Sequence, residues 1–434
     1  MVRLGAEFAP MRKSSPKSQL ANGSWLRFRR PVKTLRIFCF IVAVGLIYEL
    51  SINLSLLHVK SLLQSQQNEA ARTWLSYVRA YSVDRVETRI LLARVAWRAG
   101  LVEEVRQHLV AAKRLGCPDK RIEFEQTLIL AYEGRLTDME RVLQRMLLAN
   151  DDDLQHVCDA FVTGYLRQFR FDEARRLLDV WRQDFPDDSQ PWFHEGRICQ
   201  FEMRPIEASA AFEKALKNGQ HRVDIRERLA AVRVQNLEFA EAAKHYDLLL
   251  RIQPDHVEWL VGFGVCLFND GNAKQAREAF LKALTISPTH HDGRLAFAEL
   301  EANDGHFEEA LRLSSDLCHE FPNDYSVRYL MARMLRTLDR QEESLKHVQW
   351  LEEAERAFRE VSDLTDKVSR RPDNVQSRVE IAKRLNRYSK YSEAVGWLRA
   401  AQHLEPNNEE IRRLLAESCR LAGFDDLTPL NSSR

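Results

Sequence analysis

The sequence predicts an all-α protein built from stacked antiparallel helix pairs and preceded by one transmembrane helix. Three observations support this fold class. Glycine and proline are scarce, at 16 and 13 of 434 residues, which disfavours turn-rich all-β folds. Several prolines recur with a period of 34 residues, which is typical of repeat architectures. One apolar segment near the N-terminus is as long as a membrane span.

Charge is distributed unevenly along the chain. Residues 1–36 carry nine Lys or Arg and one acid, a net charge of +8, so the total of +1 leaves −7 on the rest. A content of 45% hydrophobic and 29% charged residues provides a large core beneath a charged surface. This composition excludes wholesale disorder and a multi-span membrane protein. The acidic body argues against nucleic-acid binding, which clustered positive charge normally supports.

The N-terminal part predicts a membrane anchor. Residues 1–34 are expected to form a disordered basic arm, and residues 35–58 a transmembrane helix. The apolar run from Ile37 to Leu57 contains Glu49 as its only charge. No small-x-small cleavage site follows the run, which favours an uncleaved anchor over a signal peptide. A buried soluble helix is the alternative.

Flanking charges predict the orientation of this anchor. Five bases lie between Arg27 and Arg36, and only Lys60 follows closely. Because Lys and Arg stay on the cytoplasmic side, we expect a cytoplasmic arm and an extracytoplasmic body, most simply in a bacterial inner membrane facing the periplasm. Seven cysteines without paired spacing argue against an oxidising compartment, so they weaken this orientation. Glu49 is expected to reach the far interface, or else to contact a partner helix.

The proline ladder defines the repeats. Pro118, Pro186, Pro254, Pro288 and Pro322 are separated by 68, 68, 34 and 34 residues. Placing each proline near the end of a unit gives units that open at Glu87, Arg121, Gln155, Ser189, Val223, Val257, His291, Tyr325 and Val375. Each unit is expected to form two helices, because a turn signal such as Asn269-Asp270-Gly271 divides it. Small residues recur at the eighth and twentieth positions, where two helices can approach closely.

This pattern resembles the tetratricopeptide repeat family over residues 87–408, in about nine repeats. The clearest unit runs from Val257 to His290, and its matching residues are Leu260, Phe263, Gly264, Ala276, Phe280, Ala283 and Pro288. The resemblance implies a right-handed superhelical solenoid. The first two units depart most, with Arg94 at a position that is usually small. Residues 59–86 are expected to form a degenerate helical pair or linker, 409–425 a capping helix and 426–434 a tail.

The repeat at 325–374 is irregular, because Pro322 and Pro372 are 50 residues apart. Apolar residues from Leu345 to Val368 recur every three or four positions without glycine or proline. This spacing predicts a second helix about 24 Å longer than usual. Its apolar face is expected to fold back onto neighbouring repeats, with a projecting partner-binding surface in the segment near 341–370 as the alternative.

No pattern in the sequence predicts a catalytic, cofactor or metal site. Gly262-Phe263-Gly264 falls inside an expected helix and predicts helix packing rather than a nucleotide loop. His290-His291-Asp292 stands at a helix start, where capping is favoured over metal binding. The cysteines are expected to fill the core as small apolar residues.

The family resemblance places a partner-binding groove along the first helices, at the second, fifth, ninth, twelfth and thirteenth residues of each unit. An aromatic and basic stretch at these positions is Phe193, Arg197 and Phe201. The acidic positions are Asp224, Glu227, Glu258, Asp292 and Glu299, and those nearer the C-terminus are Tyr329, Arg333, Arg336, Lys383 and Arg387. We expect the basic end to receive an acidic segment or a terminal carboxylate, with ordinary solvated charge as the alternative. The ninth positions lack the asparagines with which co-chaperone members clamp such a carboxylate, so chaperone-tail binding is disfavoured.

These features predict a non-enzymatic, membrane-anchored scaffold that binds partner proteins or peptides. The alternative is an assembly or maturation factor for an envelope complex, similar to repeat proteins of cytochrome c biogenesis or polysaccharide export. An enzyme would need a catalytic domain, for which the anchor and the repeats leave no room.

Overall fold

The structure is a computed structural model that describes residues 32–64, 67–136, 139–148, 153–168, 170–202 and 204–422. Within these ranges it contains 21 helices and no strand, so the predicted all-α class is confirmed. The predicted basic arm, as far as residue 31, and the predicted tail lie outside the described residues. The chain divides into two units, Met1–His58 and Val59–Arg434.

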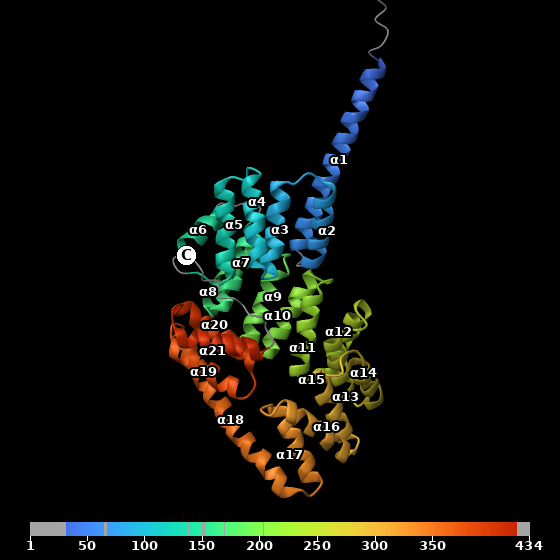
Figure 1. The fold of residues 1–434 in the computed structure, drawn as a ribbon, viewed down its shortest axis with the longest axis vertical. Helices are drawn as coiled ribbons and strands as arrows, with labels where there is room; N and C mark the ends of the chain where they lie inside the picture. Colours follow the sequence, from blue (N-terminus) through green and yellow to red (C-terminus); the bar gives the residue numbers. More distant parts are fainter. Residues whose placement is uncertain are drawn as a thin grey trace, which may run out of the picture. The chain divides into compact units, whose positions relative to one another are not determined.

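The helices follow one another along the chain (Figure 1). They are α1 (Val32–Gln64), α2 (Asn68–Tyr81), α3 (Val86–Arg98), α4 (Val102–Arg114), α5 (Asp119–Tyr132), α6 (Glu140–Leu148), α7 (Leu154–Arg167), α8 (Phe171–Asp184), α9 (Gln190–Phe201), α10 (Pro205–Asn218) and α11 (Val223–Gln235). They continue with α12 (Phe239–Ile252), α13 (Val257–Asn269), α14 (Ala273–Ile286), α15 (His291–Asn303), α16 (Phe307–Glu320), α17 (Tyr325–Thr337), α18 (Gln341–Arg370), α19 (Val375–Arg387), α20 (Tyr391–Leu404) and α21 (Glu409–Leu421).

The first unit contains most of α1. Among the described residues, one stretch, Val42–Leu63, is long and apolar enough to cross a membrane, with a mean hydropathy of 1.6. Leu46, Ile47 and Leu50 expose most of their side chains, as a helix in lipid would. The last residues of α1 belong to the second unit, where Val59 and Leu63 are fully buried.

The second unit is a series of helix pairs. Its odd-numbered helices from α3 to α19 begin within two residues of the predicted unit openings. In the first two units the residue with a positive φ at the turn is the fourteenth, Gly100 or Gly134. In the units from the fifth onward, the fifteenth residue turns the chain between the paired helices and has a positive φ. It is glycine in two units, Gly271 (φ 84°) and Gly305 (φ 85°), and Leu237 (φ 62°) in a third. Glycine adopts this conformation without strain, whereas leucine does not.

Small residues let the paired helices approach closely. A Cβ built on Gly264 of α13 would lie 2.5 Å from the Phe280 ring of α14, and one on Gly196 of α9 would lie 2.5 Å from the Phe212 ring of α10. Phe212 and Phe280 are fully buried in the core. The prediction that Gly262-Phe263-Gly264 serves packing is therefore confirmed. His290 likewise caps α15, because its Nδ1 accepts a hydrogen bond of 3.0 Å from the Gly293 amide.

The predicted long helix is α18, which has 30 residues against 14 in α14 or α16. It packs against both α17 and α19. Leu351, Ala354 and Val368 are buried along it, and Val361 and Leu364 join the core of the last repeat. The helix therefore packs onto its neighbours, as expected, and sets α19–α20 apart from α17.

The second unit also makes a contact between repeats that are distant in sequence. Helix α20 contacts α7, although their nearest ends are more than 200 residues apart. At this contact the buried Arg378 of α19 donates from Nη2 to the Gln168 carbonyl oxygen at 3.3 Å, and to the Pro372 carbonyl oxygen at 2.7 Å. Beyond α18, the chain thus returns to its third repeat.

Candidate functional site

A buried ion-pair network joins the first repeats. The guanidinium of Arg94 on α3 binds Glu125 of α5 at 2.6 Å and Asp153 before α7 at 2.7 Å. Arg121 also binds Asp153, at 2.7 Å. Because Arg94 and Glu125 are almost completely buried, each needs the other to remain charged. This pairing explains why arginine stands at a position that other repeats fill with a small residue.

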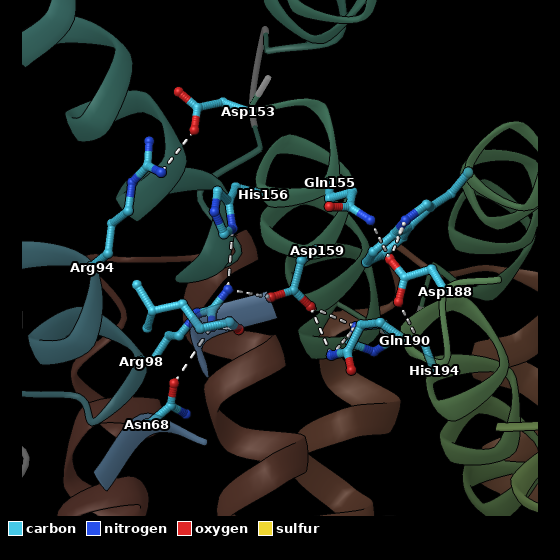
Figure 2. A network of polar contacts seen from close by, with 12 residues as sticks. Asn68, Arg94, Arg98, Asp153, Gln155, His156, Asp159, Asp188, Gln190 and His194 are labelled. Atoms are coloured by element: carbon cyan, nitrogen blue, oxygen red, sulfur yellow. Dashed lines mark hydrogen bonds and ion pairs between the residues drawn. The ribbon is translucent and has the colours of Figure 1, made fainter. Parts of the chain in front are cut away.

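A second network is centred on Asp159 of α7. Figure 2 shows its carboxylate between Arg98 on one side and Gln190 with His194 on the other. His194 donates from Nε2 to Asp159 at 2.8 Å, Gln190 donates at 3.0 Å, and Arg98 lies 3.5 Å away. Although burial opposes it, hydrogen bonding from His194 holds the pKa of Asp159 well below its usual range. Asp159 is therefore charged in the folded chain.

The two buried histidines next to Asp159 are neutral. His156 accepts at Nδ1 from Arg98 at 3.2 Å (Figure 2), and burial together with Arg94 and Arg98 lowers its pKa to about 3. Burial also lowers the pKa of His194, and Arg197 adds to this effect. The Nδ1 of His194 lies 3.5 Å from the Arg197 guanidinium, so its lone pair faces a cation.

This geometry favours a structural role for the Asp159 network. In a nucleophilic triad, the histidine nitrogen opposite the carboxylate faces a hydroxyl or thiol, whereas His194 faces Arg197. The cleft lined by Arg98, Gln155, His156, Asp159, Trp181, Asp188 and Gln190 has a volume of only about 40 Å³. Small-molecule sites are several hundred Å³ or more. Among the described residues, no cluster of histidine, cysteine and carboxylate groups could hold a metal ion.

Next to this network lies a group of arginines on successive first helices. The Phe193 ring of α9 is buried, and the guanidinium carbons of Arg222, Arg228 and Arg197 lie 4.9, 5.7 and 6.0 Å from its centre. Arg222 is bound by Asp224. Within the described residues, no carboxylate lies within 4 Å of Arg197 or Arg228. Burial and the neighbouring Arg228 lower the pKa of Arg197 to about 10.

The distant contact brings two more arginines to this surface. Arg167, at the end of α7, lies over the Tyr132 ring at 4.6 Å. Arg399 lies on α20, and burial, together with the charge of Arg167, lowers its pKa. Neither arginine has a carboxylate within 4 Å in the described part of the chain. We call Arg167, Arg197, Arg228 and Arg399 the arginine cluster.

Sequence reasoning selected only Arg197 from this cluster. Arg167 stands at a thirteenth position of its unit, so the same rule could have selected it. Arg228 is a sixth residue and Arg399 belongs to a second helix. Their proximity to the other two depends on the fold of several repeats and has no local signal.

The acidic positions predicted for the groove lie on successive first helices, and most have internal partners. Glu227 accepts a hydrogen bond of 2.9 Å from Trp259 Nε1. Glu258 and Asp292 are exposed and pair with the preceding histidines His256 and His291. Burial raises the pKa of Glu299, while the charge of Arg333 on the next first helix opposes the increase. The ninth positions of these two units therefore lie close together.

The remaining predicted positions divide into paired and exposed residues. Lys383 binds Glu410 at 2.8 Å, and Arg387 lies 3.6 Å from Glu353. Residues Tyr329, Arg333 and Arg336 of α17 are exposed. Phe201 is also exposed and stacks on Phe171, with a distance of 5.9 Å between ring centres. The structure thus brings Phe193, Arg197 and Phe201 together on α9, separate from the exposed residues of α17.

A family model described as Tetratricopeptide repeat matches residues 228–291. This range covers most of α11, all of α12, and the pair α13 and α14, within the regular series of helix pairs. Residues 228–291 therefore contain tetratricopeptide repeats.

Solved structures that are similar to this chain include tetratricopeptide repeat proteins. One from Parabacteroides merdae has 18% identity and a TM-score of 0.38, and the match covers 64% of this chain and 99% of that one. YrrB, described as a tetratricopeptide repeat protein with an unusual peptide-binding site, has 17% identity, coverages of 40% and 90%, and a TM-score of 0.31. A MamA fragment from Desulfovibrio magneticus has 17% identity, coverages of 39% and 95%, and a TM-score of 0.36.

No curated protein matches the sequence. The similarities to solved structures are too low to transfer a partner to this chain. The binding surface therefore has to be argued from the chain's own side chains.

Proposed function

We propose that this protein is a membrane-anchored, non-enzymatic scaffold that binds a partner protein or peptide through the first helices of its repeats. The observation that carries the proposal is the exposure of large aromatic side chains beside arginines that have no ion-pair partner among the described residues. Phe201 and Tyr329 are 45% and 54% exposed, and Arg333 and Arg336 lie on the helix of Tyr329. Aromatic residues and arginine are enriched at protein interfaces.

The anchor in this proposal is α1. Its stretch Val42–Leu63 has a suitable length and hydropathy for a membrane span, and the basic residues before it favour a cytoplasmic N-terminus. Extraction at alkaline pH tests the anchoring, and we expect the full chain to stay in the membrane fraction. Reporters fused after Arg434 test the orientation. Activity of only a cytoplasmic reporter would contradict an extracytoplasmic body.

The binding surface is tested by photo-crosslinking in membranes. We expect a photoreactive amino acid in place of Phe201 or Tyr329 to form a crosslink to a defined partner, identified by mass spectrometry. The matched controls are Leu248 and Leu281, which are 41% and 48% exposed on the second helices α12 and α14. They are expected to give no such product. Crosslinking from the control positions alone would contradict the proposed surface.

A further inference from the structure

The arginine cluster is a concentration of positive charge that the described part of the chain does not neutralise. Arg167, Arg197, Arg228 and Arg399 come from α7, α9, α11 and α20. Most other arginines near them are paired, as Arg98 is with Asp159, Arg175 with Glu202 and Arg222 with Asp224. Arg197 is half-buried, whereas Arg167, Arg228 and Arg399 are exposed. Like charges held close together repel one another, and a bound anion removes this cost.

The four side chains form one group. Arg197 and Arg228 approach the same Phe193 ring, and the contact of α7 with α20 brings Arg399 toward Arg167. The charges of Arg228 and Arg167 both lower the pKa of Arg197, and that of Arg167 lowers the pKa of Arg399. The group therefore includes both sides of the contact between α7 and α20.

The chemistry of the group indicates its ligand. A guanidinium binds a carboxylate through two parallel hydrogen bonds, and four of them on four helices suit several carboxylates spaced along one chain. The exposed Phe201 ring follows Arg197 by one helical turn and lies on the same face of α9. An acidic protein segment with a neighbouring apolar residue would use both features, whereas a small inorganic anion would use only the charges.

We propose that the arginine cluster binds a carboxylate-rich segment of the partner protein, and that the bound carboxylates hold α20 against α7. This inference rests on the proposed function and gives the partner a chemical class. It also assigns a role to α18, because the length of that helix places α20 where Arg399 can meet Arg167.

The test measures the binding of a fluorescein-labelled hexaglutamate peptide to the full chain in detergent. We expect the wild-type protein to bind hexaglutamate and not hexaglutamine, with an affinity that falls as salt is added. The double variant Arg197→Gln/Arg228→Gln is expected to bind about tenfold more weakly, which corresponds to the loss of about one charge-assisted pair. The control Arg176→Gln/Arg356→Gln removes the same charge from exposed arginines of α8 and α18 and should change the affinity less than about twofold.

A second readout concerns α20. Hexaglutamate is expected to slow amide hydrogen exchange in α7 and α20 of the wild-type protein, and Arg399→Gln should abolish this protection in α20. If the glutamine variants do not fold, Arg197→Lys/Arg228→Lys keeps the charge but loses the paired hydrogen bonds. It is then expected to bind more weakly than the wild type.

Equal hexaglutamate affinity in the cluster variant and the control would overturn the inference, as would displacement of the peptide by equimolar pyrophosphate. Failure of this inference can be distinguished from failure of the proposed function. If Tyr329 still crosslinks a partner while the wild type does not bind hexaglutamate, only the inference fails. If no first-helix position crosslinks a partner, the proposed function fails.

Discussion

Gly264 shows how single residues set the distance between paired helices. A Cβ at this position would lie 2.5 Å from the Phe280 ring, whereas a Cβ on Gly396 of α20 would have no atom within 4 Å. We expect Gly264→Ala to lower the free energy of unfolding by about 1–3 kcal/mol, because the buried ring has to move. The control Gly396→Ala should raise it by up to about 1 kcal/mol through helix propensity. Denaturant unfolding measures both changes, and a stabilising Gly264→Ala would contradict the packing described.

Arg94 is a second single residue with a large structural effect, because it places a buried charge where other repeats have a small residue. The variant Arg94→Leu leaves Glu125 buried with only Arg121, at 3.4 Å, as its ion-pair partner, and we expect it to lose about 3 kcal/mol of stability. The double variant Arg94→Leu/Glu125→Leu should recover much of this loss. Unfolding curves of the two variants check the prediction, and equal stabilities would show that the pair is not coupled.

At the scale of elements, several turns between paired helices share one position with a positive φ, a conformation that strains residues other than glycine. Leu237 and Gly271 are both fifteenth residues of their units, with φ values of 62° and 84°. We expect Leu237→Gly to stabilise the protein by about 1 kcal/mol, and Gly271→Ala to destabilise it by a similar amount. Leu237 is largely exposed, so little packing is lost. Thermal unfolding compares the two variants, and changes of the same sign would contradict this reading of the turn.

Structural features that are encoded within one or two repeats could be predicted from the sequence. Residue spacings inside one or two units predict where the helices start, where glycine turns the chain, the cap at His290 and the length of α18. These spacings are visible because the same packing positions recur in each repeat. The contact of Arg378 with Gln168 was not predictable, because it depends on small rotations added over five repeats and on the direction of α18. Arg228 and Arg399 were missed for the same reason.

At the scale of the whole molecule, histidines that are buried or half-buried beside arginines make stability depend on pH. His108, His156, His194 and His245 each lie 3.2–3.5 Å from an arginine guanidinium. Burial lowers the pKa of all four, to about 3 for His156 and about 4 for His245. Because the unfolded chain binds these protons more readily, stability should be full above about pH 6.5 and fall as the pH decreases. The raised pKa of His291 acts in the opposite direction.

Guanidinium unfolding at about pH 7.5 and about pH 5 measures this dependence. Each buried histidine contributes up to about 1.4 kcal/mol per pH unit. The double variant His156→Gln/His245→Gln should therefore lose less stability between the two values than the wild type. An identical loss in both proteins would contradict the assignment of these histidines as neutral.

The proposed arginine site depends on the contact between α7 and α20, because this contact brings Arg399 toward Arg167. A distance measurement tests the contact most directly. Spin labels would be placed at Asp172, at the start of α8, and at Ser392 on α20, both exposed, with the native cysteines of the full chain replaced. If α20 packs against α7, we expect one narrow distribution of short distances in detergent, which broadens when Arg378 is replaced by Gln. A broad distribution at long distances in the otherwise unaltered chain would contradict it.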